Sequence, residues 1–116
     1  MQIYVRTDNN IDGSGKLTAY VEGEIAAALS RFSDHITRIE VHLSDESGGR
    51  ATGADIRCTI QARLAGQTPL TVTDDAGSVD AALVGGIHRL NHLLESHEGR
   101  QEEQGARASI RGQATQ

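Results

Sequence analysis

The chain has 116 residues, of which 37% are hydrophobic, and carries a formal net charge of −5 at pH 7. This length suits one domain with one small core, and no apolar run is long enough to cross a membrane. General nucleic-acid binders are usually basic, so we expect no DNA binding, and the single cysteine, Cys58, excludes an intramolecular disulfide and predicts a reducing, cytoplasmic location.

The first part of the chain predicts a strand followed by a helix. Ile3 and Val5 alternate with polar neighbours, which is typical of a short strand and unlike a signal peptide. Turn residues 7–15 precede a predicted helix over residues 15–32. Its apolar positions recur at helical spacing and are Leu17, Val21, Ile25, Ala28, Leu29 and Phe32. The small residues opposite indicate a solvent surface or an interaction face.

Three further strands follow, because apolar and polar residues alternate over 38–43, 56–64 and 70–73. Residues 45–53 are rich in turn formers and predict a hairpin loop, and residues 65–67 predict a tight turn. Asp74 and Asp75 precede the next helix and are interpreted as part of a turn.

The last element is a long amphipathic helix from Ser78, a plausible N-cap, to Gly99, a plausible stop. Its apolar stripe consists of Val79, Leu83, Ile87, Leu90 and Leu94, and His88, His92 and Ser96 fall on the opposite face. Gly86 borders the stripe and predicts close approach of the first helix near Ala28. Residues 100–116 are polar and predict a disordered tail.

The predicted fold is α+β with the order β-α-β-β-β-α, in a domain spanning residues 1–99. A right-handed crossover would make the first two strands parallel, and the two hairpins would add antiparallel pairs, which gives sheet order 1-2-3-4. Each strand shows one apolar side, so both helices must cover the same face of this four-stranded mixed sheet. The result is a two-layer sandwich whose other sheet face is open.

Several segments resemble the ribosome hibernation-promoting factors, also called ribosome-associated translation inhibitors. The likeness covers about residues 1–100. Met1-Gln2-Ile3 opens family members, and residues 17–21 (LTAYV) and 32–36 (FSDHI) resemble their first helix and the junction that follows it. Ala81-Ala82-Leu83, with Gly85, Ile87, Arg89 and Leu90, resembles the helix-two signature.

The resemblance implies a stress factor without catalytic activity or cofactor. Such a factor binds 16S-type rRNA of the small ribosomal subunit, in the channel for mRNA and tRNA, and sterically inhibits translation. The chain resembles the short form, which has no ribosome-pairing domain. Basic residues usually end the family's second helix, whereas here His92, Ser96 and Glu98 stand there and only Arg89 and Arg100 are basic. The alternative is therefore a protein-interaction module, or weak homodimer, of the same fold.

Positive charge also gathers on the outward sides of the predicted strands, at Arg6, Arg38, Arg57 and Arg63. These side chains could bind phosphates locally, since salt screens each charge beyond about 10 Å at 0.1 M. They could instead form cross-strand ion pairs with Glu40 and Asp55. The rRNA-binding candidates are thus these four arginines together with His88, Arg89, His92 and Arg100. With few aromatic residues in the chain, base stacking is not the expected mode.

Other chemistry is not indicated. His88 and His92 are four residues apart and could share a metal ion, but no third ligand is apparent, so we expect solvated histidines and no metal. Cys58 lies in the inward series of its strand and is interpreted as an inert core thiol. We expect no enzyme.

Overall fold

The computed structural model describes residues 1–8, 11, 13–47, 53 and 55–114, and side chains as far as residue 97. Its elements follow the predicted order. They are β1 (Gln2–Thr7), α1 (Gly15–Ala28), the 3-10 turn η1 (Ser30–Phe32), β2 (Ile36–Asp45), β3 (Ile56–Leu64), β4 (Leu70–Ala76) and α2 (Val79–Ala114).

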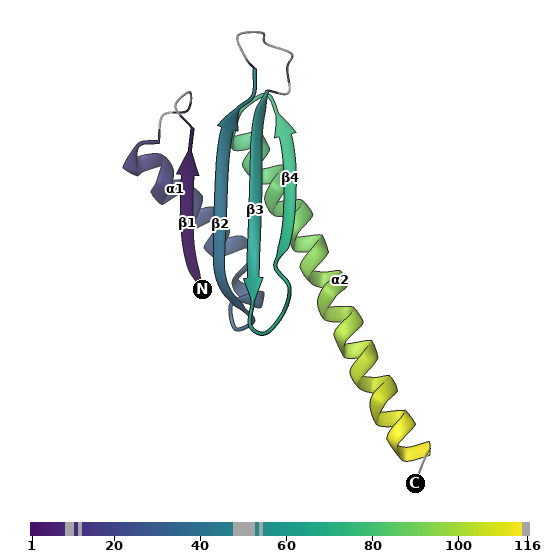
Figure 1. Cartoon of the computed structure of the whole chain (residues 1–116). Helices are drawn as coiled ribbons and strands as arrows, with labels where there is room; N and C mark the ends of the chain where they lie inside the picture. Colours follow the sequence, from purple (N-terminus) through teal and green to yellow (C-terminus); the bar gives the residue numbers. More distant parts are fainter. Residues whose placement is uncertain (9–10, 12, 48–52, 54, 115–116) are drawn as a thin grey trace.

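The four strands form one mixed sheet in the order β1-β2-β3-β4, as predicted (Figure 1). β1 pairs with β2 in parallel, with Ile3 opposite Ile39. β2–β3 and β3–β4 are antiparallel, with Val41 opposite Ile60 and Ile60 opposite Val72. This pairing therefore places the inward-pointing apolar side chains of neighbouring strands side by side across the sheet.

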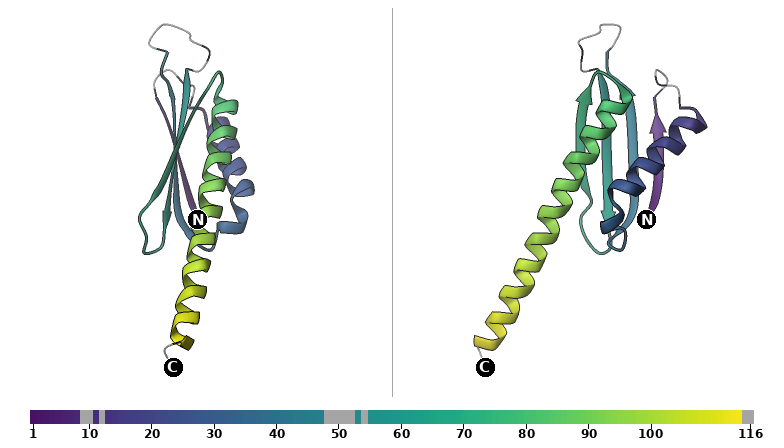
Figure 2. Two further views of the ribbon diagram at one scale, coloured as in Figure 1. Left: turned by 90° about the vertical axis from the view of Figure 1, so that its right-hand side faces the viewer. Right: turned by 180° about the vertical axis from the view of Figure 1, so that it is seen from behind.

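Both helices cover the same face of the sheet, and the other face is open (Figure 2). The predicted stripes meet the sheet there: Val21 and Ile25 of α1 and Leu29, which follows α1, are fully buried, as are Leu83 and Leu90 of α2. The core between the layers also holds alternating residues of β2 and β3. These are Ile39, Val41, Leu43, Cys58, Ile60 and Ala62. The predicted two-layer α+β sandwich is confirmed.

Serine hydroxyls cap both helices, which satisfies backbone donors that have no partner inside the helix. Ser14 Oγ accepts from the Leu17 N–H at 3.2 Å, and Ser78 Oγ accepts from the Ala81 N–H at 3.1 Å. Asp80 adds an acidic side chain to the first turn of α2, where the helix dipole favours negative charge.

The predicted bounds need three corrections where backbone or side-chain contacts outweigh the local pattern. α1 ends at Ala28 rather than Phe32, because Asn91 of α2 donates to the Ala28 carbonyl at 3.1 Å and the chain tightens into η1. Asp74 and Asp75 lie in β4 and not in a turn, because the β3–β4 ladder continues through them to Ala76. The predicted loop at 45–53 begins after Asp45, and residues 48–52 lie outside the described part.

α2 also continues through Gly99, the predicted stop, to Ala114, and its last turns extend beyond the sheet (Figures 1 and 2). The segment after residue 99 is drawn as helix here, and its predicted disorder stays a prediction. No proline follows Gly99, and glutamine, glutamate, alanine and arginine, which favour helix, fill much of the segment. The proposed division into a domain ending at residue 99 and a separate tail stays a prediction.

Gly85 and Gly86 bring α2 close to the sheet and not, as predicted, close to α1. A Cβ on Gly86 would lie 3.1 Å from Ile60 Cδ1 and 3.3 Å from Cys58 Sγ, both on β3. A Cβ on Gly85 would lie 2.1 Å from Asp74 Oδ2 on β4. The two glycines therefore create the space that lets α2 pack against β3 and β4.

Candidate nucleic-acid interface

The predicted basic residues lie on two different surfaces. Arg6, Arg38, Arg57 and Arg63 project from the open face of the sheet, which faces the viewer in Figure 1. His88, Arg89 and His92 lie on α2, in the other layer, and all three are exposed. No single site combines them. The side chain of Arg100 lies outside the described part of the chain.

The sheet register arranges the open-face arginines in rows. Arg38 of β2 stands opposite Arg63 of β3, and Arg6 of β1 stands opposite His42 of β2. Arg38 and Arg63 are like charges directly opposite on neighbouring strands, and such charges repel. This arrangement disfavours the sheet slightly and leaves positive potential available to an anion.

Two of the four arginines are neutralised by nearby carboxylates. Arg38 contacts Glu40 at 2.8 Å along the same strand, and its guanidinium lies 4.2 Å from the centre of the Tyr4 ring. Arg57 pairs across strands with Asp75 at 2.9 Å, and the hydrogen bond to that carboxylate raises the pKa of Arg57. Glu40 is therefore the partner of Arg38, but along one strand and not across strands as predicted, and the cross-strand partner of Arg57 is Asp75 and not Asp55.

Arg6 and Arg63 have no ion pair with any carboxylate of the described residues. Arg6 borders a shallow hollow of about 250 Å³ on the open face, together with Glu40, His42 and Gln61. These two arginines are the positive charges of the sheet that a phosphate could bind without first displacing a carboxylate.

On the other layer, a groove of about 500 Å³ runs between the free edge of β4 and α2. Thr71 and Thr73 of β4 line one side, and Arg89, His92 and Ser96 of α2 line the other. Hydroxyl, guanidinium and imidazole groups are all suitable donors to phosphate oxygens. The groove thus brings together Arg89, His92 and Ser96 of α2, whereas the side chains of Thr71 and Thr73 belong to the outward series of β4, where Thr73 Oγ1 contacts Thr59 Oγ1.

Asp74 is the residue of this region that sequence reasoning missed. Its Oδ1 accepts from Arg89 Nε at 2.9 Å, and its side chain is 17% exposed against 62% for Arg89. The signal was present in β4, where Leu70, Val72, Asp74 and Ala76 share the inward phase of the alternation. A carboxylate in an inward series needs a partner, and the facing helix supplies Arg89.

The two histidines of α2 contact each other, with ring centroids 4.7 Å apart in an edge-to-face arrangement. His88 and His92 also border a groove of about 420 Å³ that Arg31 closes on the side of α1. Arg31 lies in η1, donates to Asn91 at 2.8 Å and pairs with Glu95, so it connects η1 with α2. Within the described part of the chain, no three His, Cys, Asp or Glu side chains come together as metal ligands.

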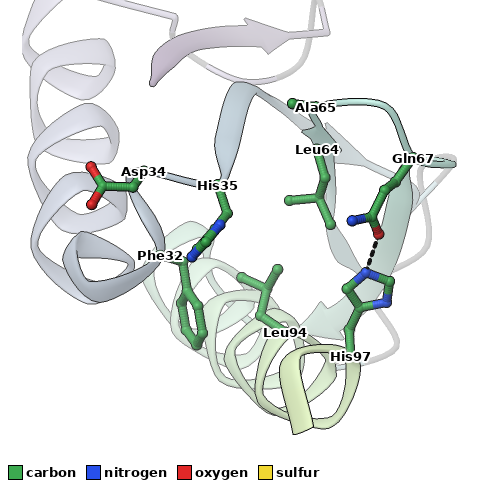
Figure 3. A pocket seen from close by; sticks show the side chains of 8 residues that line it. All are labelled: Phe32, Asp34, His35, Leu64, Ala65, Gln67, Leu94 and His97. Carbon is green, nitrogen blue, oxygen red and sulfur yellow. Dashed lines mark hydrogen bonds between the residues drawn. The ribbon is translucent and has the colours of Figure 1, made fainter. Parts of the chain in front are cut away.

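A small apolar pocket of about 140 Å³ lies at the end of the domain from which α2 extends (Figure 3). Phe32, Leu64 and Leu94 form its apolar lining, and His35 stands beside them. His97 closes one side through a hydrogen bond with Gln67. Of the phosphate-binding candidates whose side chains the structure describes, none lines this pocket.

Cys58 is the core thiol that its strand position predicts, with none of its surface exposed. Burial raises its pKa to about 12, and the charge of Asp74 adds to the shift. A thiol so rarely ionised at neutral pH is a poor nucleophile.

Comparison with known proteins identifies the fold and its family. The family model described as sigma 54 modulation protein / S30EA ribosomal protein matches residues 4–102. The chain belongs to this family. Proteins of this family, called the ribosomal S30AE family, are ribosome-associated factors of hibernation and translation inhibition, without catalytic activity.

Solved structures agree with this assignment. The N-terminal domain of Protein Y from Thermus thermophilus superposes with a TM-score of 0.65 at 26% identity, covering 84% of this chain and 99% of that one. A ribosomal subunit interface protein from Coxiella burnetii shares the fold, with a TM-score of 0.65 at 16% identity, covering 85% and 99%. No curated protein sequence matches the chain. No helix among the described residues is both long enough and apolar enough to cross a membrane.

Proposed function

We propose that this S30AE protein binds the small ribosomal subunit in the channel for mRNA and tRNA and inhibits translation by occupying it. The observation that carries the proposal is the family match over residues 4–102, which includes both basic surfaces. The protein would act in the cytoplasm, where ribosomes are found, with rRNA and not DNA as its partner.

Recognition would depend on phosphate contacts and shape, not on base stacking. Arg38 already covers the ring of Tyr4, and the hydroxyl of Tyr20 is bound to Asp80. Phe32, the single phenylalanine, is 2% exposed. Folded RNA can be recognised through its backbone without exposed aromatic platforms, and this mode suits a channel lined by rRNA.

The contacts proposed on α2 are Arg89, His92, His88 and Arg100, and those on the sheet are Arg6, Arg63, Arg38 and Arg57. We place the main contact at Arg89, since the resemblance to the family's second helix implies a basic contact there and Arg89 is the basic residue of that segment. The open sheet face is the competing orientation, and Arg6 and Arg63 are its strongest members because they lack ion pairs with described carboxylates.

Co-sedimentation with isolated small subunits at several salt concentrations tests this proposal. Each phosphate contact releases counterions, so affinity should fall as salt rises, and loss of one contact should reduce the slope of log K against log salt by roughly one. Added mRNA and tRNA should compete with the protein if it occupies their channel.

The variants must respect the ion pair of Arg89. Arg89→Glu would set two carboxylates against each other at Asp74, so Arg89→Gln is the appropriate change, with Arg6→Gln and Arg63→Gln combined as the sheet-face counterpart. We expect Arg89→Gln to weaken binding more. Loss confined to the sheet-face variant would reverse the proposed orientation. A protein that never sediments with small subunits, even at low salt, would instead fit an interaction module or homodimer.

A further inference from the structure

Asp74 occupies an unusual place for a carboxylate, on the helix-facing side of β4 and opposite Cys58 in the sheet register. One of its oxygens, Oδ1, accepts from Arg89 Nε at 2.9 Å. The other, Oδ2, lies over the backbone of α2 at Gly85, only 2.1 Å from where a Cβ on that glycine would stand. The carboxylate is therefore held in a notch that exists because residue 85 is glycine.

This arrangement uses only part of the hydrogen-bonding capacity of Arg89. A guanidinium has five N–H donors in a rigid plane, and Nε supplies one of them. With Nε bound to Asp74, the plane is oriented, and the two Nη groups remain for other acceptors. Arg89 borders the β4–α2 groove, as do His92 and Ser96 of the same helix.

We propose that Asp74 is a positioning residue, which holds Arg89 by Nε so that its Nη groups are presented to an RNA phosphate in the β4–α2 groove. An arginine held in this way has already lost much of the rotamer freedom that a mobile side chain would lose on binding. The ribosome-binding part of this inference rests on the function proposed above, whereas the orientation of Arg89 is a property of the free protein.

Charge alone predicts the opposite role for Asp74. A carboxylate close to an RNA site repels phosphate, so its removal should strengthen binding by simple electrostatics. Positioning predicts that loss of the acceptor weakens binding although a negative charge is lost. The two accounts therefore differ in sign.

Binding of the full chain to small subunits would be compared for Asp74→Ala, which removes the acceptor, and Asp74→Asn, which removes the charge and replaces one oxygen by an NH2 group but retains an acceptor oxygen. We expect Asp74→Ala to bind roughly fivefold more weakly than Asp74→Asn, the order of effect of freeing one long side chain. Asp74→Ala should add nothing in an Arg89→Gln background, since the two residues act as one unit. Equal or tighter binding of Asp74→Ala relative to Asp74→Asn would overturn the proposal.

Gly85→Ala provides a second, independent disturbance of the same contact. The new Cβ would lie 2.1 Å from Asp74 Oδ2 and 2.6 Å from Cγ, so the carboxylate must leave the notch. Alanine favours helix over glycine, so a general weakening of α2 is not expected from propensity. We expect the same loss of binding as for Asp74→Ala. Binding unchanged from the parent would contradict the claim that the place of Asp74 beside Gly85 matters for binding.

The orientation itself can be measured without ribosomes. Heteronuclear NMR of the Arg89 Nε–H group in the free protein should report a rigid side chain in the parent and in Asp74→Asn, and a mobile one in Asp74→Ala and Gly85→Ala. An Arg89 group that is equally mobile in the parent and in Asp74→Ala would refute positioning. If the parent fails to sediment with small subunits, the proposed function fails, while this NMR comparison still decides the role of Asp74.

Discussion

Leu90→Ala tests the face that α2 presents to the sheet. Leu90 is fully buried, lies in the middle of the α2 stripe and belongs to the core that β2, β3 and both helices share. The substitution removes three carbon atoms, which corresponds to about 2.4 kcal/mol of lost transfer free energy at about 0.8 kcal/mol per methylene. An unfilled cavity adds to this cost, and comparable buried Leu→Ala changes destabilise by about 3–5 kcal/mol.

The expected loss is a large part of the free energy of unfolding of a small domain, which is about 5–15 kcal/mol. It should appear as a lower urea midpoint at unchanged slope, and as a fall of roughly 10–20 °C in the melting temperature. His92→Ala is the matched control on the same helix, because His92 is exposed, and it should change stability by less than about 0.5 kcal/mol. Similar losses from both variants would refute the assigned helix face.

Other predictions concern the Cys58 thiol, the hydrogen bond from Tyr20 of α1 to Asp80 of α2, and the C-terminal segment. Cys58, with no exposed surface and a pKa raised to about 12 by burial, should resist thiol reagents near neutral pH until denaturant is added; rapid labelling of the native protein would show that the register of β3 is wrong by one residue. Tyr20 has a pKa raised to about 12, first by its hydrogen bond to Asp80, so an ultraviolet titration should show its phenol ionising well above pH 10. Because the folded-state pKa is the higher one, the stabilisation by this bond is complete below about pH 10 and is lost as pH rises towards 12; a Tyr20→Phe variant that leaves the titration curve unchanged would contradict the assignment. Deletion of residues 100–116 should leave the melting temperature nearly unchanged, since the segment is polar and α2 extends beyond the sheet there; a fall of several degrees would mean that the segment packs against the domain.

The architecture could be predicted because its signals are local and repeated. Alternation in residues 56–64 and helical spacing from Val79 to Leu94 each define one buried face, and the connection lengths leave few topologies. Boundaries were harder to predict. The end of α1 depends on Asn91, which lies 63 residues further along the chain, and the extent of β4 depends on its pairing with β3.

The sequence predicted which basic residues belong to the candidate interface, but not which carboxylates pair with them. The sequence places Arg57 and Arg89 among exposed basic residues, and both are exposed. Ion pairing depends on which carboxylate the fold brings near, and Asp75 and Asp74 were interpreted as turn residues. Because both residues lie in β4, Asp75 forms an ion pair with Arg57 and Asp74 forms one with Arg89.

The sequence alone determined the order of elements, the apolar face of each one, the buried state of Cys58 and the family resemblance, because these follow from periodicity and short motifs along the chain. Tertiary structure alone decided which arginines are neutralised, where Gly85 and Gly86 make their close approach, and that Asp74 and Arg89 meet beside the β4–α2 groove. The physical reason is the number of residues over which each feature is specified. A hydrophobic stripe repeats over many residues and tolerates small errors, whereas an ion pair or a missing Cβ depends on two atoms from distant segments lying within a few ångströms.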